Sequence, residues 1–351
     1  MRTRKLGTTS LDVSLIGLGT MTWGQQNTEV EGHAQMDYAL EHGVNFFDTA
    51  ELYSIPPKPQ TAGATERIIG SWFKGRGTRS KVILATKAVG RSTMTWFREN
   101  GAPPRITKAQ LTEAIDKSLK RLNTDYIDLY QLHWPDRSLP WGANPSRYVA
   151  SEFEGGDDGA PMAETLEILQ GFIQAGKARY IGVSNESGWG TMRFLSESSA
   201  HGLPRIQSIQ NAYNLLNRTF DTGLAEIAMR EHVSLLAYSP LAQGYLTGKY
   251  LDGARPAGSR SELFNRGQRY ELTATDDAIR AYIALARAYS LDPAQMAIAF
   301  VNQQPFVASS LIGATSMEQL ATNIGAINVT LTSEINAKID DIHQRYGNCA
   351  P

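Results

Sequence analysis

Four side chains at the ends of apolar runs have the chemistry to protonate a carbonyl oxygen together. Asp48 ends the run "VNFFD", and Tyr53 follows it five positions later. Lys87 ends "KVILATK", and His133 ends "YIDLYQLH". A free tyrosine has a pKa of about 10, so it is a weak acid at neutral pH and needs a partner that favours the phenolate.

The lysine can be that partner. At ~4 Å, an ammonium group favours the phenolate by up to about 4 kcal/mol at an effective dielectric near 20, or roughly three pKa units. This effect opposes the upward shift that burial causes. A buried Lys87 needs an anion to stay charged, which Asp48 can supply, and His133 can orient the carbonyl through a hydrogen bond.

Each of the four residues also has an ordinary structural explanation. An aspartate after a strand is commonly a helix cap or a turn residue. Tyr53 could serve packing, Lys87 could lie in a solvated turn, and His133 could be a structural residue before Trp-Pro. The catalytic interpretation rests on finding all four at the ends of three successive runs.

The elements that must position these residues alternate regularly along the chain. Amphipathic stretches separate the apolar runs, as in residues 106–122, where Ile106, Leu111, Ile115, Leu119 and Leu122 recur near helical spacing. Eight runs that each precede a helix predict a (β/α)8 TIM barrel, with residues 1–351 as one domain. The predicted strands are residues 13–19, 44–48, 81–87, 126–133, 178–185, 206–213, 233–240 and 306–314.

In such a barrel the carboxyl ends of all strands face one mouth. The later runs end in Ser184 and Asn185, in Gln210 and Asn211, and in Tyr238. Residues 134–160 and 241–273 follow strands four and seven and exceed ordinary connection lengths. Long loops at this face commonly cover a substrate or cofactor.

The composition narrows the class of protein. The chain has 351 residues, 42% hydrophobic and 20% charged, with a net charge of −1, so no basic excess indicates nucleic acid or an anionic membrane. Cys349 is the single cysteine, which rules out an internal disulfide and a cysteine metal cluster. No window reaches the ~18 apolar residues of a membrane span, and no signal peptide is evident, so we expect a cytoplasmic protein with no metal.

The glycines of "GLGTMTWG" do not fit a dinucleotide fingerprint. The third glycine has the wrong spacing for G-x-G-x-x-G, and no acidic residue follows at the required distance. As the end of barrel strand one, the stretch predicts instead that Gly19, Thr20, Met21 and Trp23 line a pocket.

Taken together, these segments resemble the aldo-keto reductase family. The resemblance runs nearly from end to end, and within the family it is greatest to the bacterial Tas-like branch, which is related to the potassium-channel β-subunits. The segments that carry it are "IGLGTMTWG", "NFFDTAELY", "ATK", "RLNTDYIDLYQLHWP", "GKARYIGVSN", "IQNAYNLLNR", "LLAYSPLAQGYLTGKY" and "LIGATSMEQLATNI".

The resemblance implies an NADP(H)-dependent carbonyl reductase whose catalytic tetrad is Asp48, Tyr53, Lys87 and His133. It further implies that the nicotinamide is held by Ser184, Asn185 and Gln210, with Tyr238 stacked on the ring. The remaining cofactor contacts that it implies lie at Gly19, Thr20, Met21, Asp48, Ser239, Leu241, Gln243, Gly244, Lys249 and Arg260, and at Gly313, Thr315, Gln319 and Asn323.

The adenosine end departs from many family members. The stretch "GATSMEQLATN" carries no Lys or Arg beside the expected 2′-phosphate, and Thr322 stands where related sequences commonly have Glu. A helix N-terminus still favours an anion. The resemblance therefore favours NADP(H), with NAD(H) as the alternative.

Two other functions fit the same residues. Lys87 could form a Schiff base with a substrate, although Asp48 beside it would keep the amine protonated. The tetrad is also compatible with a protein that senses the NADP(H) ratio for a partner. We expect a small carbonyl or alcohol substrate bound near Trp23, Tyr53, His133 and Trp134, with Trp96 and Trp141 also shaping the pocket.

Overall fold

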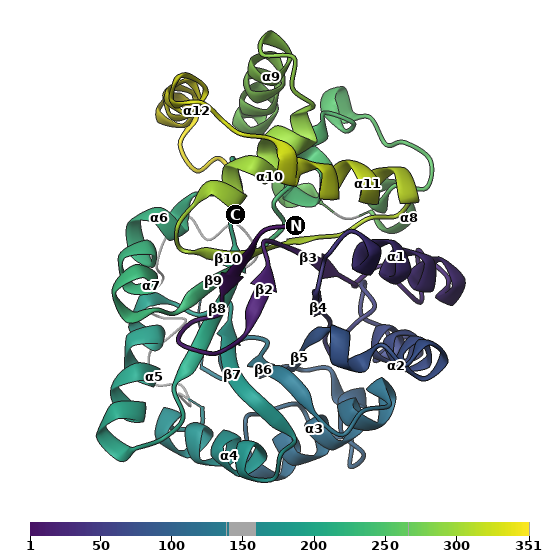
Figure 1. Ribbon diagram of the computed structural model, residues 1–351, viewed down its shortest axis with the longest axis vertical. Helices are drawn as coiled ribbons and strands as arrows, with labels where there is room; N and C mark the ends of the chain where they lie inside the picture. The colour runs from purple at the N-terminus through teal and green to yellow at the C-terminus, as the bar shows by residue number, and fades with distance from the viewer. Residues whose placement is uncertain (138, 140–158, 266, 351) are drawn as a thin grey trace.

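The core of the molecule is a closed barrel of eight parallel strands, which confirms the predicted (β/α)8 fold. The computed structural model describes residues 1–137, 139, 159–265 and 267–350. The strands neighbour one another in the order β10-β3-β4-β5-β6-β7-β8-β9, and Figure 1 shows them at the centre of the helices. Their bounds are β3 (Ile16–Gly19), β4 (Phe46–Asp48), β5 (Ile83–Ala88), β6 (Ile127–Leu132), β7 (Ala178–Ser184), β8 (Ile206–Ala212), β9 (Ser234–Tyr238) and β10 (Val307–Ile312).

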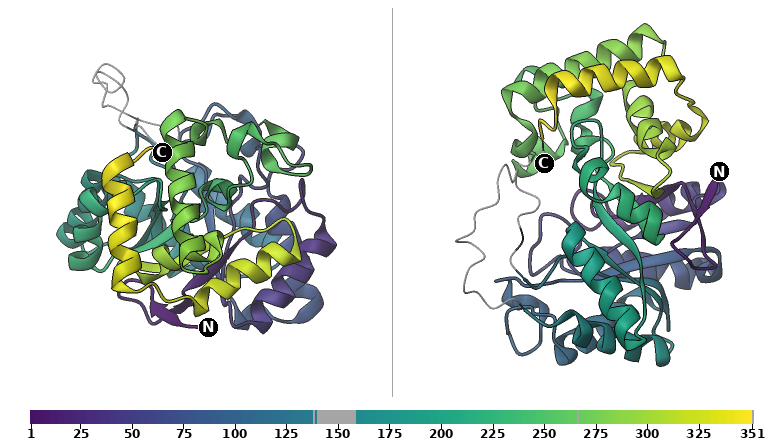
Figure 2. Two further views of the ribbon diagram at one scale, coloured as in Figure 1. Left: turned by 90° about the horizontal axis from the view of Figure 1, so that it is seen from above. Right: turned by 90° about the vertical axis from the view of Figure 1, so that its left-hand side faces the viewer.

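Helices surround this barrel, and two further helices lie side by side at one edge of the molecule. Helix α12 packs against α9, as both views in Figure 2 show. The helices are α1 (Glu29–Glu41), α2 (Ala64–Arg76), α3 (Lys108–Leu122), α4 (Met162–Gln174), α5 (Gly188–His201), α6 (Thr219–Gly223), α7 (Ala225–Glu231), α8 (Arg260–Phe264), α9 (Thr273–Ala288), α10 (Pro293–Gln303), α11 (Met317–Gly325) and α12 (Ser333–Tyr346).

Local sequence signals set the ends of the helices. Thr28 caps α1 in a capping box with Glu31. Thr107 caps α3, whose buried positions include Leu111, Ile115 and Leu122, as their spacing predicted. Asn123 then ends α3 in the left-handed conformation that asparagine tolerates.

An N-terminal β-hairpin closes the end of the barrel where the strands begin. Its strands, β1 (Thr3–Lys5) and β2 (Asp12–Ser14), pair antiparallel. The prediction of one continuous strand over residues 13–19 was therefore wrong. The amide of Leu15 still donates to Arg2 O of the hairpin, and the barrel strand begins at Ile16. The hairpin contributes Leu6, Leu11 and Val13 to a buried cluster with Phe46, Ala85, Leu129, Leu236, Ala308 and Leu311.

The two long connections follow the fourth and seventh barrel strands, as expected. The connection after β9 contains short helical turns at residues 242–247, 251–253 and 268–270 as well as α8. Most of the connection after β6, including Trp141, lies outside the described residues.

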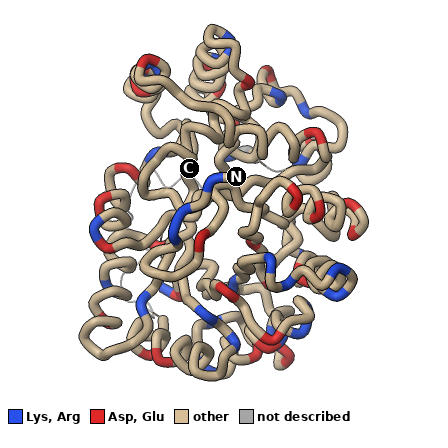
Figure 3. Tube along the Cα trace, viewed as in Figure 1, with Lys and Arg blue, Asp and Glu red and all other residues tan. Residues whose placement is uncertain are grey.

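Charges of both signs are interspersed along the chain, as Figure 3 shows. Across the described part of the chain, no helix is long and apolar enough to cross a membrane.

Candidate active site

A cavity of about 680 Å³ opens at the carboxyl ends of the barrel strands. It takes residues from the ends of β3, β4, β6, β7, β8, β9 and β10 and from the connection after β9. Of the residues predicted for the site, those that line it are Gly19, Thr20, Met21, Asp48, Tyr53, His133, Trp134, Ser184, Asn185, Gln210, Tyr238, Ser239, Leu241, Gln243, Gly244, Lys249, Arg260, Gly313, Thr315, Gln319 and Asn323.

Lys87 lies beneath the cavity floor and is fully buried. Its Nζ donates to Asp48 Oδ2 at 2.6 Å and to Thr49 O at 2.8 Å. Burial lowers the pKa of Lys87, but the carboxylate of Asp48 and the phenol of Tyr53 outweigh it, so the pKa stays above its ordinary value. The lysine is therefore a permanent cation at neutral pH.

Tyr53 lies above this ion pair. Lys87 Nζ is 3.5 Å from Tyr53 Oη and 4.9 Å from the centre of its ring. Burial raises the pKa of Tyr53, and Lys87 opposes that shift without reversing it. The phenol therefore carries its proton at neutral pH, and the lysine is placed to stabilise the phenolate once the proton leaves.

His133 faces the same point from β6. Its ring meets the ring of Tyr53 edge to face, with 5.7 Å between the centroids. Burial, reinforced by the charge of Lys87, holds the pKa of His133 well below its usual range. A neutral imidazole has one N–H to donate, which suits a carbonyl oxygen beside the phenol.

The second oxygen of Asp48 is held by two glutamines. Gln210 Nε2 donates to Asp48 Oδ1 at 2.8 Å, and Gln131 Nε2 does so at 3.3 Å. Sequence reasoning missed Gln131. The signal was present, because Gln131 lies two residues before His133, and side chains two apart on a strand point to the same face.

The side chains expected around a nicotinamide are bonded to one another. Tyr238 Oη donates to Asn185 Oδ1 at 2.8 Å, and Asn185 Nδ2 donates to His133 O at 2.9 Å. Ser184 Oγ donates to Gln210 O at 2.8 Å. Asn185 has a φ of 52°, a left-handed conformation that asparagine adopts more readily than most residues. These bonds fix the orientation of Tyr238 and of the Asn185 amide at the cavity wall.

The connection after β9 brings three cationic side chains to the cavity wall, those of Lys249, Arg260 and Arg269. It turns sharply through Gln243 and Gly244, which have φ values of 58° and 98°. Lys249 lies beside this turn, and a Cβ at Gly244 would come within 3.0 Å of Lys249 Cε. Arg260, at the start of α8, lines the same region. Cationic side chains in a cavity that is also lined by the ring of Tyr238 fit a dinucleotide, which has both a phosphate bridge and flat rings.

The far end of the cavity is built on the N-terminus of α11. The amide and hydroxyl of Thr315 both donate to Gln319 Oε1 at 3.1 Å, and Asn323 Nδ2 donates to Gly313 O at 3.2 Å. Asp292, Glu318 and Thr322 line the cavity nearby.

Two of the tryptophans expected to shape the pocket do not reach it. Trp23 is fully buried and donates its indole N–H to Gln35 at 3.0 Å, because it packs beneath α1 against Gly32. Trp96 is 39% exposed and contacts Phe97, away from the cavity. Trp134 does line it, beside an apolar wall that the sequence reasoning did not identify, formed by Leu52, Ile55 and Pro57.

No group of three or more His, Cys, Asp or Glu side chains suited to a metal ion occurs within the described ranges.

Barrel and site together define an oxidoreductase of the aldo/keto reductase family, and the chain belongs to that family: the family model matches residues 15–344. Members of this family generally use NAD(P)H. The predicted family is thus confirmed.

Individual relatives agree with this assignment. The chain is 48% identical to the protein tas of Escherichia coli over 356 aligned positions that cover all of both chains. It is 33% identical to the uncharacterized oxidoreductase YrpG of Bacillus subtilis, over 99% of this chain and 97% of that one. It is also 30% identical to a putative voltage-gated potassium channel subunit beta of Schizosaccharomyces pombe, over 97% of this chain and 92% of that protein.

Proposed function

We propose that this protein is an NADP(H)-dependent reductase that converts aldehydes or ketones to alcohols, reversibly. The observation that carries the proposal is the buried chain of contacts from Asp48 through Lys87 to Tyr53, with distances of 2.6 and 3.5 Å. It ends in a protonated phenol at the floor of a cavity large enough for a dinucleotide and a small substrate.

The bound nicotinamide would supply hydride from its C4 atom to the carbonyl carbon. Tyr53 donates its proton to the carbonyl oxygen, and Lys87 stabilises the phenolate that results. Asp48 keeps Lys87 charged, and neutral His133 donates a hydrogen bond that orients the carbonyl. Solvent then returns a proton to Tyr53. Tyr238, held by Asn185, offers the ring against which a nicotinamide would stack.

Lys249 and Arg260 support a phosphate-bearing cofactor, and both line the cavity. The N-terminus of α11 supports an anion at the adenosine end. We therefore propose NADP(H) over NAD(H).

The contacts of Lys87 weigh against a Schiff-base enzyme. An amine held at 2.6 Å by a carboxylate, with a raised pKa, stays protonated and is a poor nucleophile.

Fluorescence titration with NADPH and with NADH, followed by a carbonyl panel at saturating cofactor, tests the proposal. Tyr53→Phe should lower kcat for 4-nitrobenzaldehyde by about 10²–10⁴-fold, because it removes the general acid, while NADPH still binds. Full activity in that variant would contradict the role of Tyr53. Tight NADPH binding with negligible wild-type turnover across the panel would indicate a cofactor-sensing protein instead.

A further inference from the structure

A second buried ion pair lies directly behind the segment that carries Tyr53. Glu51 stands between Asp48 and Tyr53 in the sequence, and its partner Arg98 comes from the connection between β5 and α3. Each residue is 3% exposed. Arg98 Nη1 donates to Glu51 Oε2 and Arg98 Nη2 to Glu51 Oε1, both at 2.9 Å. This bidentate geometry fixes the orientation of both side chains.

The Glu51 carboxylate also extends the pairing between β4 and β5. Beyond the end of β4, the amides of Thr49 and Glu51 donate to the carbonyls of Ala85 and Lys87 at 2.9 and 3.2 Å. One residue beyond the end of β5, the amide of Val89 donates at 2.7 Å to the side chain of Glu51. A carboxylate oxygen thus takes the place of the next backbone carbonyl, where the chain has already turned toward Tyr53.

The Glu51–Arg98 pair therefore connects the segment that carries Tyr53 with the segment that carries Lys87. The separation of these two segments sets the distance between Tyr53 and Lys87. Lys87 lies two residues before Val89, and Tyr53 lies two residues after Glu51. The neighbouring side chains of Ala50, Leu52, Val89, Phe97 and Trp134 form one buried cluster, which includes two residues of the cavity wall.

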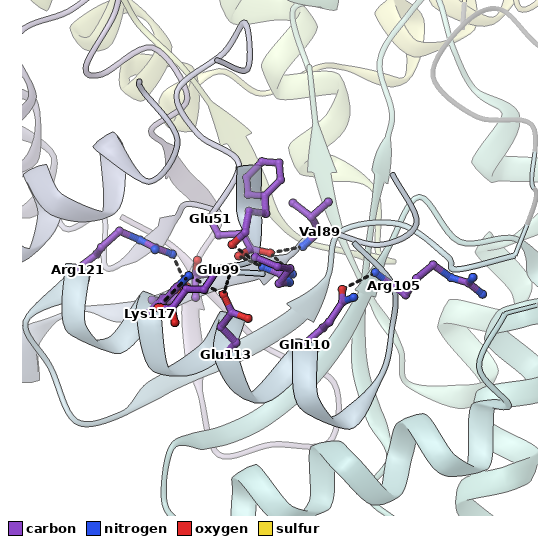
Figure 4. A network of polar contacts seen from close by, with 12 residues as sticks. Glu51, Val89, Glu99, Arg105, Gln110, Glu113, Lys117 and Arg121 are labelled. Carbon is purple, nitrogen blue, oxygen red and sulfur yellow. Dashed lines mark hydrogen bonds and ion pairs between the residues drawn. The ribbon is translucent and has the colours of Figure 1, made fainter. Parts of the chain in front are cut away.

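Arg98 is itself held from outside the barrel. The amide of the next residue, Glu99, donates to Glu113 of α3 at 2.8 Å, and Lys117 pairs with Glu113 at 2.5 Å. Figure 4 shows this network running from Glu51 outward to α3.

We propose that Glu51 and Arg98 are positioning residues, which hold Tyr53 at contact distance from Lys87 and thereby set the rate of proton transfer. This inference rests on the proposed reductase function. A displacement of about 1 Å in a reacting group can cost about 10²-fold in rate, and the 3.5 Å between Lys87 Nζ and Tyr53 Oη leaves little margin before the contact is lost.

Asp128 supplies a matched control, because it makes a comparable contact at the opposite end of β5. Asp128 is 2% exposed, accepts the amide of Leu84 in β5 at 2.9 Å, and pairs with Arg79 at 2.8 Å. It therefore combines the same three features as Glu51: burial, a bond to β5 and an arginine partner. It differs in lying at the closed end of the barrel.

The test compares Glu51→Gln and Arg98→Lys with Asp128→Asn. Arg98→Lys keeps the charge but loses the planar fork, so it separates geometry from charge. We expect Glu51→Gln and Arg98→Lys to lower kcat for 4-nitrobenzaldehyde by about 10- to 100-fold. KM and the NADPH Kd should stay within about twofold of wild type. Asp128→Asn should lower the thermal unfolding midpoint but leave kcat within about twofold of wild type.

A double variant guards against simple misfolding. Glu51→Gln/Arg98→Gln removes both buried charges, so it should recover stability relative to the single variants. It should not recover kcat, because the carboxylate and the fork are both gone. Recovery of kcat together with stability would overturn the proposal, as would wild-type kcat in Arg98→Lys and Glu51→Gln, or an equal loss of kcat in Asp128→Asn.

A readout without turnover separates this inference from the proposed function. In protein labelled with ¹³C at tyrosine Cζ, Tyr53→Phe identifies the Tyr53 resonance. Glu51→Gln and Arg98→Lys should shift that resonance, and Asp128→Asn should not. If the wild-type protein reduces no carbonyl, the proposed reductase function fails, and the spectrum alone then tests the positioning role. A Tyr53 resonance that does not shift in Glu51→Gln would overturn that role.

Discussion

Two buried aspartates at opposite ends of the barrel, Asp128 and Asp48, have different partners. At the closed end, Asp128 is bonded to two arginines, Arg79 and Arg179. At the open end, Asp48 is met by one lysine and two glutamines, and the lysine also reaches Tyr53. An arginine stays protonated in almost any environment, whereas lysine, tyrosine and histidine respond to theirs.

This difference indicates a division of labour. At the closed end, Asp128 is bonded to two arginines and the N-terminal hairpin covers an apolar cluster, so this end contributes stability. The open end concentrates groups whose proton affinities depend on one another. Substitutions at the two ends should therefore separate stability from catalysis.

Lys87→Met should have the largest effect, because it should lower both the stability of the protein and its activity. It leaves Asp48 buried without its cation, which should cost about 3–5 kcal/mol of the free energy of unfolding. It also removes the charge that stabilises the phenolate, so kcat should fall by about 10²–10³-fold. Urea unfolding and steady-state kinetics measure the two losses. A stable variant with wild-type kcat would refute the open-end assignment.

Leu129→Ala tests the closed end. Leu129 is fully buried beneath the site in the cluster that the hairpin covers. Its truncation should lower the free energy of unfolding by about 2–5 kcal/mol. Because the truncation removes no hydrogen bond of the site, kcat and the NADPH Kd should stay within about twofold of wild type at temperatures where the variant is folded. A large loss of kcat in the folded variant would show that the two ends are not independent.

His133→Gln should have the smallest effect on stability. The way this effect changes with pH follows from the lowered pKa of His133. The pKa of His133 is well below its usual range in the folded protein, so the unfolded chain binds a proton near pH 6.5 that the folded protein does not. Stability from this group is therefore present above about pH 6.5 and is lost as the pH falls, by up to about 1.4 kcal/mol per pH unit.

The measurement is the difference in free energy of unfolding between wild type and His133→Gln from pH 7 to pH 5. Wild type should lose more stability on acidification than the variant. Parallel curves would mean that His133 is already charged, or free to become so, in the folded protein.

The sequence, with the family resemblance, was sufficient for the barrel and for about half of the cavity lining. The strand ends of a parallel barrel converge at one mouth whatever the loop sequences are, so the sequence predicts that Asp48, Tyr53, Lys87 and His133 lie together. The adjacent Gln131 needed only the alternation of side chains along β6.

Other features depend on contacts that the strand pattern does not encode. The hairpin was missed because Val13 to Gly19 reads as one apolar run, and only the antiparallel bond from Leu15 to Arg2 divides it. Trp23 was misplaced because a residue four positions after a strand can point inward or outward, depending on the turn. Glu51 and Arg98 lie 47 residues apart in a loop pair, and neither sits in a periodic element that predicts its partner.

One carboxylate, that of Asp48 on β4, receives donors from β5, β6 and β8. Four of the eight barrel strands are thus connected through this carboxylate, which also belongs to the proposed catalytic site. Redesign for a new substrate should therefore keep Asp48 and its hydrogen-bond donors. The cavity wall at Met21, Ile55 and Pro57 is the better place for substitutions, because its shape can change without loosening the barrel.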